Sequence, residues 1–218
     1  MTTTPDLYPV PALNAVAVYC SASSAIDTHF IEAARTIGAA LAANELRMVF
    51  GGGRVGLMGE AAKACKTAGG RVTGITTEKL DAIEGLSEHC DESRIVATMP
   101  ERRSLMMELA DAFVILPGGL GTYEEFFEVV VGRQLGDHAK PIVIVNHNGF
   151  YGPMMAMIDH GIEHKFIRPA IREALIVVDD AADALPALIA HRPGRHDPAD
   201  YLYLPEHDDQ QTELAQAS

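Results

Sequence analysis

Short apolar runs rich in β-branched residues alternate along this chain with longer segments of helical periodicity, and this alternation constrains the fold more than any other feature. Seven runs have the length and composition of strands: 15–20, 46–50, 71–76, 94–98, 112–117, 141–146 and 174–178. Segments of helical period lie between or after them: 28–43, 56–68, 100–110, 122–135, 150–163 and 180–190. Several strands are continuously apolar, as expected where helices cover both faces of a parallel sheet. The sequence therefore predicts a doubly wound, Rossmann-like α/β fold with a mainly parallel sheet.

Length and composition favour one domain. The chain has 218 residues, of which 48% are apolar, which is enough for a single well-buried core. We expect the domain to occupy residues 14–190, with terminal extensions at 1–13 and 191–218. From residue 191 onward the sequence gains proline, aspartate and glutamine and loses its periodicity, so we expect the C-terminal end to be disordered.

The charge balance limits the class of partner. With 17 Lys+Arg against 30 Asp+Glu, the formal net charge is −13, which argues against binding to nucleic acid. A single phosphate needs only a few backbone N–H groups and an arginine, so a small anionic ligand remains compatible with this charge. No stretch approaches the roughly 18 apolar residues of a membrane span, and the N-terminus lacks a signal-peptide pattern, so we expect a cytoplasmic protein with no membrane partner.

The three cysteines, Cys20, Cys65 and Cys90, lie far apart and form no C-x-x-C pair. This spacing predicts reduced, mostly packed thiols and neither a zinc site nor a redox disulfide.

Ligands of a doubly wound sheet bind beyond the carboxyl ends of its strands. Three loops follow strands at that edge: 20–27, 51–59 and 117–125. Residues 51–56, GGGRVG, fit the G-x-G-x-x-G pattern of dinucleotide-binding turns, and an acid, Glu78, follows the next strand. Three interpretations stay open: a nicotinamide-cofactor site, a general nucleotide or phosphate contact through Gly52 and Gly53, and a purely structural turn.

The loop at 117–122, PGGLGT, is the stronger candidate for a phosphate site. Its three glycines free the backbone to expose N–H groups, and Thr122 adds a hydroxyl at the start of a helix. The sequence Thr122-x-x-Glu125 also fits a capping box, which is the structural alternative. Since a helix rises about 1.5 Å per residue, Glu125 lies roughly 5 to 6 Å behind the loop, about the reach from a sugar 5′-phosphate to its anomeric carbon. A carboxylate there could stabilise the oxocarbenium-like transition state of N-glycosidic cleavage or orient the attacking water.

Two adjacent arginines, Arg102 and Arg103, follow the fourth strand in the segment MPERRS. In an acidic chain they are candidates for a clamp on a phosphate or on ribose hydroxyls. The alternative is a solvated helix start with ordinary surface ion pairs.

Two further patterns are weaker evidence about the function. His160 and His164 have the spacing of two metal ligands on one helix face, but no H-E-x-x-H pattern and no obvious third ligand accompany them, which favours a polar helix surface. None of the five lysines stands in a Schiff-base context, which argues against an amino-acid decarboxylase that uses pyridoxal phosphate.

Two long segments resemble a known family. FGGGRVGLMGEAAKA at 50–64 and TMPERRSLMMELADAFVILPGGLGTYEEFFEVVVGRQLG at 98–136 are similar to the LOG ("Lonely guy") family of cytokinin riboside 5′-monophosphate phosphoribohydrolases, whose members are often labelled lysine decarboxylases. The similarity runs from about residue 16 to about residue 180, and it rests on the paired signatures M-x-x-R-[KR] and P-G-G-x-G-T-x-x-E.

The resemblance implies a Rossmann-like fold, a homodimer, and release of free base and ribose 5-phosphate from nucleoside monophosphates without a metal or an organic cofactor. Arg102 and Glu125 match the essential arginine and glutamate of the family. The positions that the resemblance implies at the substrate are Glu84, Arg103, Gly118, Gly119, Leu120, Gly121, Thr122, Tyr123 and Glu124. Among these, Glu124 is a candidate ribose contact.

Two departures bear on the base. CSASS at 20–24 replaces the more usual C-G-S-S, and Val131-Gly132 stands where plant members commonly have Thr-Trp. They leave open whether the preferred base is an isoprenylated adenine or plain adenine, as in an AMP nucleosidase. The prediction is a hydrolase of AMP-like or N6-substituted adenosine 5′-monophosphates. Its alternatives are a non-catalytic nucleotide or cofactor carrier on the same fold and a dinucleotide-dependent oxidoreductase.

Overall fold

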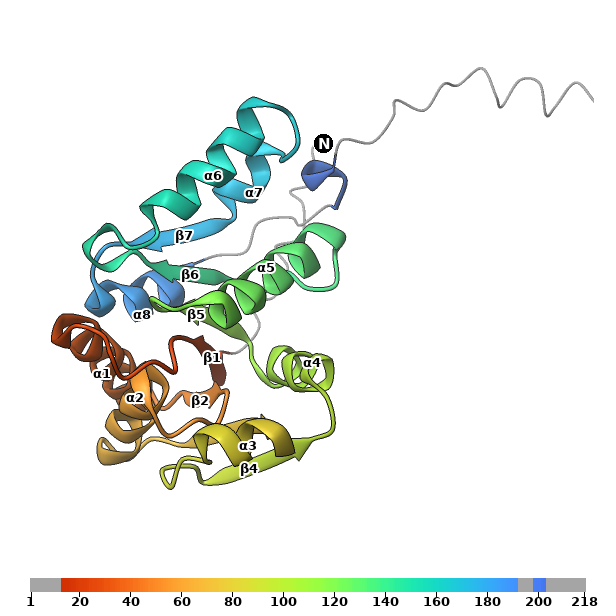
Figure 1. Cartoon of the computed structure of the whole chain (residues 1–218). Coiled ribbons are helices and arrows are strands. Elements are labelled where there is room, and N and C mark those ends of the chain that lie inside the picture. The colour runs from red at the N-terminus through yellow and green to blue at the C-terminus, as the bar shows by residue number, and fades with distance from the viewer. Residues whose placement is uncertain (1–12, 192–197, 203–218) are drawn as a thin grey trace, which may run out of the picture.

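The computed structural model describes residues 13–191 and 198–202, and within them seven parallel strands form one sheet. Figure 1 shows that helices flank the sheet on both sides. The strands are β1 (Ala15–Tyr19), β2 (Arg47–Phe50), β3 (Val72–Thr77), β4 (Glu92–Val96), β5 (Ala112–Ile115), β6 (Ile142–Val145) and β7 (Leu175–Val178). Their order across the sheet is β4-β3-β2-β1-β5-β6-β7, and every neighbouring pair is parallel. The predicted doubly wound α/β fold is confirmed.

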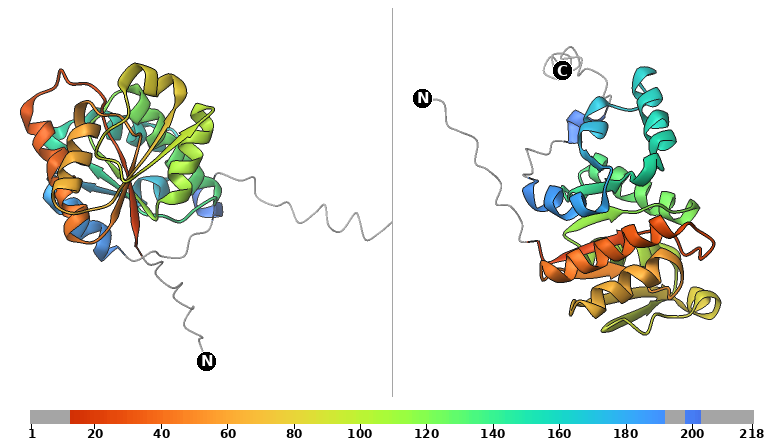
Figure 2. Two further views of the ribbon diagram at one scale, coloured as in Figure 1. Left: turned by 90° about the horizontal axis from the view of Figure 1, so that it is seen from below. Right: turned by 90° about the vertical axis from the view of Figure 1, so that its left-hand side faces the viewer.

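The helices divide between the two faces of the sheet (Figure 2). The helices are α1 (Thr28–Ala43), α2 (Gly56–Thr67), α3 (Glu78–Glu84), α4 (Met99–Leu109), α5 (Leu120–Leu135), α6 (Gly152–Glu163), α7 (Pro169–Glu173) and α8 (Ala181–Ala190), with short 3₁₀ turns η1 (His147–Gly149) and η2 (Pro198–Tyr201). Apolar side chains of α1, α2 and α8 share one core cluster, and those of α4, α5, α6 and α7 share the other. The central strand β1 is buried on both faces, because alternate residues supply the two clusters.

Most predicted boundaries agree with the structure to within two residues, and three details differ. The fourth strand begins at Glu92, two residues before the prediction, because β4 is an exposed edge strand with charged residues at its start. The short helices α3 and α7 were not predicted, since seven and five residues carry too little periodicity. Helix α5 begins at Leu120 and not at residue 122, which changes the interpretation of the loop before it.

The predicted packing of the cysteines is confirmed: Cys20 and Cys65 are buried, Cys90 is partly buried, and all three are free thiols. None of the described helices is long and apolar enough to cross a membrane.

Part of the expected C-terminal extension belongs to the fold. The backbone carbonyl of Leu202 accepts a hydrogen bond of 2.8 Å from Arg168 Nε, and Tyr201 lies in the core cluster under α5. The expected disorder of the C-terminal end concerns residues 203–218, which lie outside the described residues.

The strand order places the candidate loops together. From β1 the chain winds outward through β2 to β4 on one side and through β5 to β7 on the other. In such a sheet the crevice opens where the order reverses, beyond the carboxyl ends of the strands next to β1. The loops after β1, β2 and β5 therefore meet, as the sequence predicted.

Candidate active site

The glycine loop after β5 leads into α5 without a side-chain cap. The N-cap residue of α5 is Gly119, and within the described part of the chain no side chain caps this end of the helix. The first N–H groups of a helix lack acceptors within the helix and carry the positive end of its dipole, so this start favours an anion. A Cβ atom added to Gly119 or Gly121 would meet nothing within 4 Å, so the space beside the loop is open.

The capping-box interpretation of Thr122 and Glu125 is wrong. Both residues lie inside α5, which begins at Leu120, so neither caps it. The Thr122 side chain is buried against the loop instead, since a Cβ atom on Gly118 would lie 2.1 Å from Thr122 Oγ1. Glu125 thus lacks the capping role that the pattern suggested.

A true capping box starts the neighbouring helix α4. The backbone N–H of Glu101 donates to Thr98 Oγ1 at 3.3 Å, and the Glu101 carboxylate accepts from the Thr98 N–H at 3.2 Å. This cap fixes the first turn of α4. Arg102 and Arg103 follow immediately and lie over the sheet.

Arg102 is buried and held by the backbone. Only 6% of the residue is exposed. Its Nε donates to the carbonyl of Ile75 at 2.8 Å, and its Nη2 donates to the carbonyl of Gly51 at 3.1 Å. The guanidinium is therefore anchored above the ends of β3 and β2, and the interpretation of Arg102 as a solvated surface residue is wrong.

Glu125 completes a buried ion pair with this arginine. Its Oε1 lies 3.6 Å from Arg102 Nη1, and 11% of its side chain is exposed. Burial raises the pKa of Glu125 to about 7, against the opposing effect of Arg102. The carboxyl thus has a pKa near neutrality. Such a perturbed pKa is typical of groups that stabilise charge or transfer protons at an active site.

A second ion-pair cluster lies beside the first. Arg103 Nη1 lies 3.0 Å from Glu124 Oε1, and Arg103 Nε pairs with Glu128. Glu124 and Glu128 are one turn apart on α5, so both carboxylates reach the same guanidinium. Glu124 is largely exposed, and Arg103 is mostly buried.

The triple-glycine loop forms the other wall. A Cβ atom on Gly53 would lie 2.9 Å from Glu84 Oε2, which places the Glu84 carboxylate against this loop. The loop is tied to the segment after α3 by the Ser87 N–H, which donates to the Gly52 carbonyl at 2.8 Å. Gly52 has φ +78°, a conformation that favours glycine.

The structure brings most of the predicted positions to one edge. Arg102 joins the triple-glycine loop to Glu125, while Arg103 joins α4 to Glu124. Leu120 is highly exposed at the mouth of the loop, and Tyr123 packs edge-on against another tyrosine at 6.0 Å.

Two contributors escaped the sequence reasoning. Gly51 supplies a carbonyl acceptor to Arg102, and Glu128 supplies a second carboxylate to Arg103. The spacing of Glu128 from Glu124, four residues on a helix, could have indicated it.

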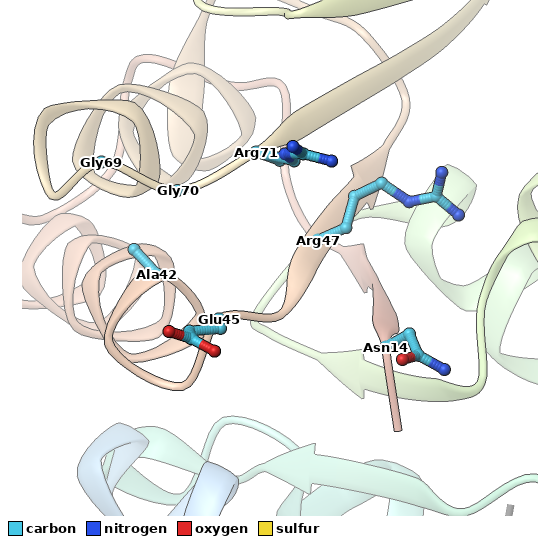
Figure 3. A pocket seen from close by; sticks show the side chains of 7 residues that line it. All are labelled: Asn14, Ala42, Glu45, Arg47, Gly69, Gly70 and Arg71. Carbon is cyan, nitrogen blue, oxygen red and sulfur yellow. The ribbon is translucent and has the colours of Figure 1, made fainter. Parts of the chain in front are cut away.

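Two other features lie away from this edge. His160, Glu163 and His164 bring potential metal-ligand atoms within 4.8 Å of one another, but all three are exposed at the end of α6. A cavity of about 570 Å³, lined in part by Arg47 and Arg71, lies at the opposite, amino-terminal edge of β1 to β3 (Figure 3). Neither feature contacts the Arg102–Glu125 pair.

Fold and site together define a class of protein. It is a Rossmann-like α/β protein in which a glycine loop, an uncapped helix start and a buried arginine–glutamate pair meet where the strand order reverses. A family model described as "Possible lysine decarboxylase" matches residues 58–188. The cytokinin riboside 5′-monophosphate phosphoribohydrolase of Rhodococcoides fascians is 42% identical over 82% of this chain and 90% of the relative. A cytokinin riboside 5′-monophosphate phosphoribohydrolase of Arabidopsis thaliana is 35% identical over 82% and 83% of the two chains. The chain therefore belongs to the family of the cytokinin riboside 5′-monophosphate phosphoribohydrolases, the LOG family.

Solved structures share the fold at lower identity. A molybdenum cofactor binding protein from Rippkaea orientalis has a TM-score of 0.64 at 16% identity, covering 83% of this chain and 98% of that one. The molybdenum cofactor carrier protein of Chlamydomonas reinhardtii has a TM-score of 0.63 at 20% identity, covering 82% and 99%. At these identities the likeness concerns the fold alone.

Proposed function

We propose that this protein hydrolyses the N-glycosidic bond of adenosine 5′-monophosphates, plain or N6-substituted, and releases the free base and ribose 5-phosphate. One observation carries the proposal: the buried Arg102–Glu125 pair lies one helical turn behind an open, uncapped glycine loop. Membership of the phosphoribohydrolase family supports the same reaction.

In this reaction a water oxygen bonds to C1′ as the bond from C1′ to the base nitrogen breaks. The electrons of that bond stay on the base, which takes the proton that the water releases. Positive charge develops on the ribose before the new bond is complete.

The geometry suggests a role for each part. The N–H groups of Leu120, Gly121 and Thr122 bind the 5′-phosphate, because they lie at the positive end of α5. Glu125 faces the developing charge on the ribose or orients the water, and the anchored Arg102 fixes the position of Glu125 and binds the substrate. Arg103, Glu124, Glu84 and the loop at Gly52 and Gly53 complete the wall around the nucleotide.

We also propose that the chain forms a homodimer, as the family resemblance implies. Large apolar side chains exposed on α5, among them Val131 and Leu135, are available for an interface with a second copy.

Incubation with nucleotides tests the reaction. AMP and isopentenyladenosine monophosphate should each release free base, detected by chromatography together with ribose 5-phosphate, whereas adenosine should stay intact because it lacks the phosphate that the loop binds. GMP and CMP in the same panel define the base preference.

Other outcomes would contradict the proposal. Binding of AMP without release of adenine would indicate a nucleotide carrier. Tight binding of NAD with no cleavage of any monophosphate would indicate an oxidoreductase.

A further inference from the structure

Four residues lie in one row across the sheet: Ile75 on β3, Gly51 after β2, Tyr19 on β1 and Ile115 on β5. Tyr19 pairs directly with Ile115. The parallel registers of the β3–β2 and β2–β1 pairs, continued by one or two residues, place Gly51 between Ile75 and Tyr19. Tyr19 is thus the next residue in the row after the two whose carbonyls hold Arg102.

The Tyr19 side chain points to the same face as Arg102 and Glu125. Tyr19, Ile75 and Ile115 belong to the core cluster under α4 and α5. A Cβ atom on Gly51 would lie 1.9 Å from Arg102 Nη2, so the guanidinium occupies the space above Gly51. Neighbouring strands are about 4.8 Å apart. The Tyr19 ring therefore lies on the same face of the sheet as the Arg102 guanidinium, about one strand spacing away from it.

The hydroxyl of Tyr19 has no hydrogen-bond partner among the described residues. Only 2% of the residue is exposed, and its ring stacks on Phe113 with centroids 6.0 Å apart. Buried tyrosine hydroxyls usually find a partner, as Tyr151 does by donating to the Leu116 carbonyl at 2.7 Å. A deeply buried tyrosine whose hydroxyl has no partner among the described residues, next to a candidate catalytic pair, points to a ligand.

The environment keeps this hydroxyl a donor. Burial, and then the carboxylates of Glu125 and Glu128, raise the pKa of Tyr19 well above its usual value. The phenol therefore carries its proton at neutral pH and can donate to an oxygen of a substrate.

We propose that the Tyr19 hydroxyl donates a hydrogen bond to a ribose hydroxyl of the bound nucleotide, beside the Arg102–Glu125 pair. This role rests on the proposed hydrolysis. The backbone N–H of Leu116 donates to the Tyr19 carbonyl at 2.9 Å, so Tyr19 lies level with the strand end that leads into the phosphate loop. The phosphate binds at the loop, Glu125 faces C1′, and the ribose between them lies over Tyr19.

The test is Tyr19→Phe, which removes only the hydroxyl, with Tyr151→Phe as a matched control. With AMP as substrate, Tyr19→Phe should lower kcat/KM about tenfold or more while the melting temperature stays equal or rises. Tyr151→Phe should show the opposite pattern, a lower melting temperature and kcat/KM within about threefold, because its hydroxyl is bonded inside the protein.

Substrates that lack one hydroxyl locate the contact. For either 2′-deoxy-AMP or 3′-deoxy-AMP, the losses from the substrate change and from Tyr19→Phe should be non-additive, because both remove the same bond. Unchanged kcat/KM in Tyr19→Phe, a fall in melting temperature like that of Tyr151→Phe, or additive losses with both analogues would overturn the proposal. If the wild type releases no adenine, the proposed function fails. The Tyr19 contact is then tested separately by calorimetry with AMP, where equal affinities of wild type and Tyr19→Phe would reject it.

Discussion

Glu125 is a carboxyl group that the fold buries at a cost. Its pKa lies at about 7, above the ordinary value of 4.5, and the largest cause is burial. A raised pKa means that the folded state binds the proton more tightly than the unfolded state does. The associated stability is fully present below about pH 4.5 and is lost as the pH rises to about 7. At pH 8 the ionised carboxylate therefore destabilises the fold by about 3 kcal/mol.

Glu125→Gln should separate catalysis from stability. Glutamine mimics the protonated carboxyl at every pH, so the variant should unfold with a free energy up to about 3 kcal/mol higher than wild type at pH 8 and about equal near pH 4. Turnover of AMP should fall about a hundredfold or more, because the variant loses the charge that faces the ribose. Denaturant titrations at the two pH values and initial rates measure both effects.

Glu163→Gln is the matched control, since it makes the same change on an exposed carboxylate of α6. It should alter neither quantity. A Glu125→Gln variant that keeps full turnover and loses stability at pH 8 would show that Glu125 serves the fold.

Gly51 controls the position of Arg102. A methyl group there would lie 1.9 Å from Arg102 Nη2, which is closer than any real contact, so the guanidinium must leave the Gly51 carbonyl. Gly51→Ala should therefore lower kcat/KM for AMP at least tenfold, as measured by initial rates over a range of substrate concentration. Gly152→Ala is the control, because a Cβ atom there meets nothing within 4 Å, and its kinetics should match wild type. Equal activity of Gly51→Ala and wild type would mean that the anchoring of Arg102 is dispensable.

At the scale of elements, α4 and α5 carry the opposed charges of the site. The start of each helix follows a different rule: α4 begins with a side-chain capping box, and α5 begins at an uncapped glycine. The cap satisfies the Glu101 N–H in the first turn of α4, whereas the first N–H groups of α5 have no side-chain acceptor among the described residues. The difference supports the proposal that α4 positions side chains and that α5 binds an anion.

Removal of the cap should cost stability and spare the chemistry. Thr98→Ala should lower the free energy of unfolding by about 1 kcal/mol, because the Glu101 N–H loses its acceptor. Turnover should change by less than about threefold, since Arg102 is anchored by the Ile75 and Gly51 carbonyls and not by the cap. Thr98→Ser keeps the acceptor and should melt like wild type. Loss of turnover in Thr98→Ala out of proportion to the loss of stability would contradict this division of labour.

The same elements show what the sequence could predict. Short apolar runs located all seven strands of the described residues, and the tendency of ligand sites to lie beyond the carboxyl ends of parallel strands placed Arg102 and Glu125 at one edge. The start of α5 was misplaced because Thr122 is a strong capping residue by type, while the backbone at Gly119 in fact ends the loop. The anchors of Arg102 were not predictable, because backbone carbonyls of Ile75 and Gly51 leave no trace in residue type.

At the scale of the molecule, the strand order around β1 brings the loops of the site together. The outer surface of α5 lies away from the sheet and carries exposed apolar side chains. Val131 and Leu135 lie one turn apart on α5, and both are large apolar side chains with about half of their surface exposed. Paired apolar positions on the outside of a helix favour association with another apolar surface. A second copy of the chain is the partner that we propose, and a symmetric dimer would bring the two α5 helices together.

Light scattering tests the dimer. The wild type should have twice the monomer mass at about 50 μM, and Leu135→Asp should shift it toward the monomer, because a carboxylate in the interface must lose its water. Met157→Asp is the matched control: it places the same charge on an equally exposed apolar position of α6 and should leave the mass unchanged. A monomeric wild type would refute the dimer itself, and a dimeric Leu135→Asp would move the interface away from α5. Because α5 also carries Glu125, a monomeric variant that keeps its turnover would further show that each subunit holds a complete site.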